Sequence, residues 1–130
     1  MSFTEAIKSG FDNYATFSGR ASRAAYWWWF LFAILATIAA NILDSIIGAP
    51  IFSIVVGLGL LLPGLAVSIR RLHDTGRSGW WILIGLIPLI GFIVLIVFYV
   101  QEGDAGENEY GPPPIHSAAG AQPPPQAPAA

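Results

Sequence analysis

Every basic residue of this 130-residue chain lies in one of two short polar segments, and these segments alternate with long apolar runs. The first segment holds Lys8, Arg20 and Arg23, and the second holds Arg70, Arg71 and Arg77. Lys and Arg are retained on the cytoplasmic side when a membrane protein inserts, so both segments can lie inside the cell at once. The pattern predicts a membrane protein with a defined orientation.

The composition points to the same environment. Hydrophobic residues make up 55% of the chain and charged residues only 11%, and the mean hydropathy is +0.62. Such a chain is too apolar for an ordinary soluble domain, and its length allows one small domain. The absence of cysteine excludes disulfides, thiol nucleophiles and thiolate metal sites.

Three apolar runs have the length of membrane spans, at about residues 25–43, 48–69 and 80–100. At 1.5 Å per residue the first and third would extend for roughly 28 Å and roughly 31 Å, which is close to the hydrocarbon thickness of a bilayer. We therefore expect an all-α protein with three transmembrane helices. A cleaved signal peptide is the alternative for the first run, but no clean cleavage site closes it.

These spans define a membrane domain of residues 20–101 with a cytoplasmic loop at 70–79. Pro63 and Pro88 each remove one backbone donor from the second and third helices, so we expect both helices to bend there. Small residues that allow helices to approach closely predict the packing faces, namely Ala33, Ala36, Ala40, Gly57 and Gly64.

Two segments flank the membrane domain. Residues 1–19 form a cytoplasmic segment with an amphipathic helix, in which Ser2 and Glu5 have the spacing of a capping box. Residues 102–130 are acidic and then rich in Pro and Ala, so we expect a disordered tail. Because three crossings place the termini on opposite sides, this tail is predicted to be external, with the N-terminus cytoplasmic.

The arginines are the candidate site. Guanidinium groups match phosphate bidentately, so five arginines at one depth predict contact with anionic lipid headgroups or a phosphate-bearing ligand: Arg20, Arg23, Arg70, Arg71 and Arg77. His73 and Asp74 would support this polar loop. The simpler interpretation is that the arginines only fix the topology and complement a helix C-terminus.

Other functions have less support in the sequence. We identify no catalytic residues, metal ligands or cofactor, since His73 and Asp74 are adjacent and His116 falls in the opposite compartment. An enzyme acting on lipid headgroups is the weaker alternative. The spans lack intramembrane ionisable residues, so a transport role would require a homo-oligomer or a membrane-protein partner. No segment indicates nucleic-acid binding.

Two motifs resemble those of the YhaH-like bacterial inner-membrane proteins, a family catalogued as a domain of unknown function. One is Phe17-Ser18-Gly19-Arg20-Ala21-Ser22-Arg23, followed by Tyr26-Trp27-Trp28. The second and more specific runs from Leu65 to Trp81 and includes Arg70-Arg71-Leu72-His73-Asp74-Thr75-Gly76-Arg77. The resemblance implies a small multi-pass protein of the bacterial inner membrane and supplies no established activity.

Overall fold

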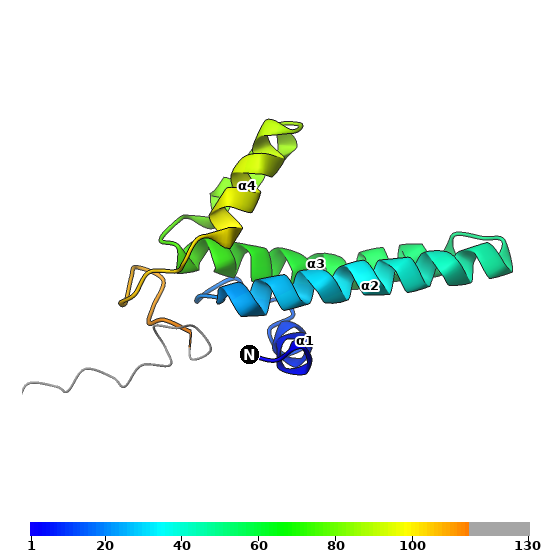
Figure 1. The fold of residues 1–130 in the computed structure, drawn as a ribbon, viewed down its shortest axis with the longest axis horizontal. Helices are drawn as coiled ribbons and strands as arrows, with labels where there is room; N and C mark the ends of the chain where they lie inside the picture. The colour runs from blue at the N-terminus through cyan, green and yellow to red at the C-terminus, as the bar shows by residue number, and fades with distance from the viewer. Residues whose placement is uncertain (115–130) are drawn as a thin grey trace, which may run out of the picture.

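The computed structural model describes residues 1–114, and its regular elements over that range are helices. They are α1 (Phe3–Asp12), α2 (Arg23–Ile47), α3 (Ile51–Asp74), the 3-10 helix η1 (Gly79–Leu86) and α4 (Ile90–Val100). Figure 1 shows α2 and α3 as a long antiparallel pair, with α1 lying across it near one end. From that same end, η1 and α4 project away from the pair. The predicted disorder of residues 115–130, and with it His116, lies outside the described range.

The two long helices correspond to the first two predicted spans. Both α2, with 25 residues, and α3, with 24, are long and apolar enough to cross a membrane. Most of their large apolar side chains are exposed, including Ile46 at 73% and Leu58 at 69%. A core helix of a soluble protein would bury such side chains, whereas lipid accommodates them.

Local chemistry sets the ends of these helices. The Ser22 hydroxyl accepts a hydrogen bond from the Ala25 amide at the start of α2, and Gly48 ends that helix in the left-handed conformation with φ 75°. The carboxylate of Asp44 then accepts from the amides of Phe52 and Ser53, at 2.7 and 3.0 Å. It thereby binds the free amides at the start of α3 and closes the turn between the two helices.

The prediction of a third span is wrong, because the third apolar run turns back on itself. After η1 the chain reverses at residues 87–89, where Leu89 has a φ of 64°, and α4 then packs against η1. With only eleven residues, α4 extends for about 16 Å, roughly half the hydrocarbon thickness. We call η1 and α4 together the apolar hairpin.

Proline and glycine explain this reversal. Pro88 disfavours the helical conformation at Ile87, whose ψ is 112°, so η1 ends there. Gly91 then allows the two arms to touch, because a Cβ atom at this position would overlap the carbonyl oxygen of Ile84. The backbones of the two arms are therefore in direct contact at Gly91 and Ile84.

The small residues predicted for helix packing occupy different environments. Ala40 is buried at 2% exposure. Ala33 and Ala36 are half-buried, and so is Gly64, where an added Cβ would lie 3.9 Å from Nε1 of Trp29. Gly57 differs from the prediction, since it is exposed and a Cβ there would meet no atom within 4 Å.

Helix α1 is fixed by its aromatic side chains. The predicted capping box is present, with Ser2 and Glu5 each bonding the other's backbone amide. Phe3 makes an edge-on contact with Trp28 at 5.7 Å between ring centroids, and Phe11 makes one with Trp29 at 5.2 Å. The apolar face of α1 therefore packs on the first turns of α2.

Candidate functional site

A single buried carboxylate links two arginines at the end of the helix pair from which the apolar hairpin projects. Oδ1 of Asp74 lies 2.9 Å from Nε of Arg20, and Oδ2 lies 2.6 Å from Nη1 of Arg71. All three side chains are at most 2% exposed. Arg71 and Asp74 belong to the last turn of α3, and the Ala21 amide bonds the Arg70 carbonyl, which brings Arg20 alongside. We call these three residues the Asp74 cluster.

Carbonyl groups of the following segment take up further donors of the Asp74 cluster. Arg71 donates to the carbonyls of Tyr99 and Gln101. Arg20 donates to the carbonyls of residues 104, 106 and 111, at 2.5, 2.7 and 3.2 Å. The two arginines therefore hold residues 101–111, which we call the C-terminal strap, against the end of α3.

The strap passes very close to the buried carboxylate. Its Asp104 amide donates to the Asp74 carbonyl at 2.7 Å. A Cβ atom at Gly103 would overlap the carboxylate of Asp74, so only glycine fits there. The strap was predicted to be disordered and on the side opposite the arginines, and both predictions fail for residues 102–111. The reversal of the third apolar run is the physical reason, because it returns the chain to the arginine end.

His73 takes part in the same packing. Its ring stacks on Tyr110 of the strap, with centroids 3.9 Å apart and planes inclined by 1°. Its Nδ1 lies 3.0 Å from the Gly19 carbonyl, an acceptor, so Nδ1 carries a proton and donates. Burial raises the pKa of the Tyr110 hydroxyl, and the neighbouring Glu109 carboxylate raises it further, so the phenol is neutral at physiological pH.

Two arginines lie at the rim, outside the Asp74 cluster. The guanidinium carbon of Arg77 lies 4.0 Å from the ring centroid of Phe98 in α4, a cation–π contact. Arg23 is exposed, and its one hydrogen bond within residues 1–114 is a long one of 3.4 Å to the Val100 carbonyl. Neither Arg23 nor Arg77 forms an ion pair within residues 1–114.

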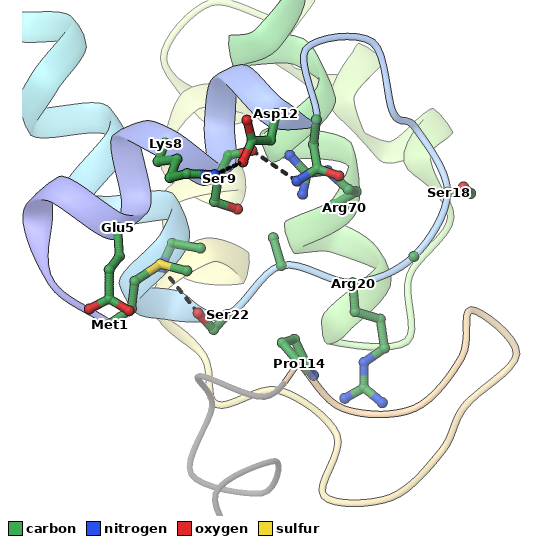
Figure 2. A pocket seen from close by; sticks show the side chains of 14 residues that line it. Met1, Glu5, Lys8, Ser9, Asp12, Ser18, Arg20, Ser22, Arg70 and Pro114 are labelled. Carbon is green, nitrogen blue, oxygen red and sulfur yellow. Dashed lines mark hydrogen bonds and ion pairs between the residues drawn. The ribbon is translucent and has the colours of Figure 1, made fainter.

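Arg70 differs from the other four arginines in its surroundings. Its side chain is buried, with 6% of the residue exposed, and its Nε and Nη2 find no hydrogen-bond partner among residues 1–114. It lines a cavity of about 530 Å³ between α1 and the loop that precedes α2. Figure 2 shows Arg70 close to the end of α1, beside Ser9 and Asp12.

The five arginines lie near one end of the helix pair, and the sequence did not distinguish their surroundings. The structure separates two that are held by Asp74, two at the rim and one in a cavity. Sequence reasoning missed the strap, although Gly103 and the turn around Tyr110-Gly111-Pro112 were visible signs that the segment could approach closely.

Polar groups elsewhere in the described part of the chain give little support to the alternative functions. Thr37 and Asn41 in α2 donate to the carbonyls of Ala33 and Thr37, within their own helix. Residues 1–114 contain no group of three His, Asp or Glu side chains that could hold a metal ion. Nothing in the site points to catalysis.

The comparisons with known proteins agree on a family. The model described as "Protein of unknown function (DUF805)" matches residues 14–112. The chain is 44% identical over 108 residues to the inner membrane protein YhaH of Escherichia coli (strain K12), an alignment covering 78% of this chain and 89% of YhaH. It is 45% identical over 104 residues to the inner membrane protein YhaI of the same strain, covering 78% and 88%.

A more distant relative is the uncharacterized protein YiiR of Escherichia coli (strain K12). It is 33% identical over 127 residues, with 74% of this chain and 84% of YiiR covered. No solved structure gives a significant match.

Proposed function

The chain belongs to the DUF805 family of proteins of unknown function, and we propose that it is an inner-membrane protein that contacts anionic lipid headgroups through Arg23 and Arg77. Two relatives are named inner membrane proteins, which supports this location. We further propose two membrane spans, α2 and α3, with the arginine end at the cytoplasmic surface. The charge asymmetry along the sequence supports that orientation.

The observation that carries the proposal is that Arg23 and Arg77 lie outside the Asp74 cluster and beside an exposed apolar surface. Trp80 and Trp81, at the base of the apolar hairpin, are 78% and 47% exposed, and Arg77 contacts Phe98 of the other arm. Tryptophan favours the headgroup level, and guanidinium groups pair with phosphate there. Cationic and aromatic side chains at one level are what a headgroup contact requires.

The apolar hairpin supports the same arrangement. Its tip exposes Leu86 at 80% and Leu89 at 71%, a surface that water would not favour. An arm of about 16 Å suits insertion into one leaflet rather than a full crossing. The hairpin would thus anchor the arginine end in the cytoplasmic leaflet and hold Arg77 near the phosphates.

The expected strength of this contact limits its role. A basic residue near an anionic leaflet contributes about 1 kcal/mol, so Arg23 and Arg77 together contribute about 2 kcal/mol, which salt reduces. That energy enriches anionic lipid around the protein and orients it. We therefore propose a structural or interaction role at the membrane surface rather than a tight receptor for one lipid.

Native mass spectrometry after mild extraction tests the proposal. We expect wild type to retain more phosphatidylglycerol than the double variant Arg23→Gln, Arg77→Gln, by about 30-fold if the full 2 kcal/mol is expressed. Lys8→Gln is the matched control, because Lys8 is exposed and pairs with Asp12 on α1. Equal lipid retention by wild type and the double variant would contradict the proposal.

A further inference from the structure

We propose that Arg70 anchors a second binding site, which takes a phosphoryl group in the cavity between α1 and the loop before α2. The site does not depend on Arg23 or Arg77, which face the outside of the molecule. It is distinct from general headgroup contact because its arginine is buried.

The first argument is the state of the Arg70 guanidinium. Nε and Nη2 have almost no accessible surface and no acceptor among residues 1–114, so the side chain must turn to present them to the cavity that it lines. These two nitrogens form one edge of the guanidinium, and that edge donates two parallel hydrogen bonds to two oxygens on one centre. A buried cation whose bidentate edge is unused calls for an oxyanion, since burying a charge without a partner is costly.

The second argument is that the other basic side chains lining the cavity, Lys8 and Arg20, are already committed. Lys8 pairs with Asp12 at 2.6 Å, and Arg20 pairs with Asp74 at 2.9 Å. Glu5 accepts from the Ser2 amide in the capping box. Among the basic side chains that line the cavity, Arg70 is the one that forms no ion pair within residues 1–114.

The cavity also offers space and further polar groups. Its volume of about 530 Å³ is larger than a phosphate ion needs and lies in the range of small-molecule sites. Ser9 of α1 lines it beside Arg70 (Figure 2). A phosphoryl group has a third oxygen for a hydroxyl donor such as Ser9 after two are bound by Arg70, whereas a carboxylate has none. The chemistry therefore favours a phosphoryl group, carried by a lipid headgroup or by a soluble phosphate ester.

Side-chain NMR of the full chain labelled with ¹⁵N-arginine tests the site directly. The Nε resonance of Arg70 is identified as the one that is absent from the spectrum of Arg70→Gln. In neutral maltoside micelles, we expect titration with inorganic phosphate to shift this resonance until it saturates. A parallel titration uses phosphatidic acid in phosphatidylcholine bicelles. A shift with phosphate alone identifies a soluble source, a shift with lipid alone identifies a headgroup, and either supports a phosphoryl site.

Two variants test whether Arg70 holds the phosphate. Arg70→Lys keeps the charge but loses the bidentate edge, so we expect phosphate to bind at least about tenfold more weakly. Gly57→Ala, the matched control, lies in α3 with open space around it and should bind phosphate as wild type does. The Nε resonances of Arg20 and Arg71 report in each variant whether the Asp74 cluster is still folded, because both nitrogens are hydrogen-bonded there.

Three results would overturn the inference. One is an Arg70 resonance that neither phosphate nor phosphatidic acid moves. Another is an equal shift with sodium acetate or sodium chloride, which would mean that the site does not select a phosphoryl group. The third is unchanged phosphate binding by a folded Arg70→Gln variant.

Discussion

The hydroxyl of Tyr14 donates a 2.8 Å hydrogen bond to the carbonyl of Gly59, in the middle of α3. Gly59 is four residues before Pro63, which has no amide hydrogen, so this carbonyl lacks its helical donor. The α-helix nevertheless continues through Pro63. A side chain that follows α1 thus supplies the donor that the proline removed, and it ties the N-terminal segment to the helix pair.

Tyr14→Phe should destabilise the protein by about 1 kcal/mol, because it leaves the Gly59 carbonyl without a donor in an apolar environment. Unfolding by SDS in mixed micelles measures the change. In a Pro63→Ala background the new amide can bond Gly59, so the same substitution should cost clearly less. An equal cost in both backgrounds would show that the hydrogen bond is not responsible.

Asp74→Asn should cost about 3 kcal/mol of stability, since it removes the negative charge between two buried arginines. Thermal unfolding in detergent gives the comparison. Asp104→Asn is the control, because Asp104 is exposed and its carboxylate bonds only Asn108 among the described contacts; we expect less than about 0.5 kcal/mol. Similar losses for the two variants would refute the central role of Asp74.

Cysteine labelling distinguishes two spans from three. The chain has no native cysteine, so Ala49→Cys, in the turn between α2 and α3, and Glu107→Cys, in the C-terminal strap, can be introduced singly. In intact spheroplasts we expect an impermeant maleimide to label position 49 and to reach position 107 only after lysis. Labelling of both positions from outside would restore the three-span topology and reject the hairpin.

Gly91→Ala should destabilise the protein by about 2 kcal/mol, because its methyl group would overlap the Ile84 carbonyl and push the arms of the hairpin apart. Unfolding by SDS in mixed micelles measures this loss of stability, with Gly57→Ala as the control. Gly57 lies in α3 with open space around it, so alanine there should be neutral or slightly stabilising. Tolerance of both substitutions would mean that the arms of the hairpin do not pack as described.

Sequence reasoning succeeded where the determinant is local. The lengths of the first two apolar runs predicted α2 and α3, and the serines at positions 2, 22 and 78 cap the helices that follow them. Caps and spans depend on residues within one or two helical turns, which a linear pattern contains.

The third apolar run shows where such reasoning fails. A full span and a half-length hairpin are equally apolar, because both present their side chains to lipid, and so composition does not separate them. The outcome depends on Pro88 ending one arm and on Gly91 letting the other arm approach Ile84. This is a contact between backbones, and its strength does not appear in a hydropathy profile.

The sequence by itself determined that the chain is helical, apolar enough for a membrane, and basic at one end only. Only the tertiary structure decided which arginines are neutralised. Asp74 reaches Arg20 and Arg71, while Arg70, next to Arg71 in the chain, points away from Asp74 and into the cavity beside α1. Successive residues on a helix are about 100° apart, so two adjacent arginines meet different surroundings, and those surroundings are set by the packing of α1 and the strap against α3.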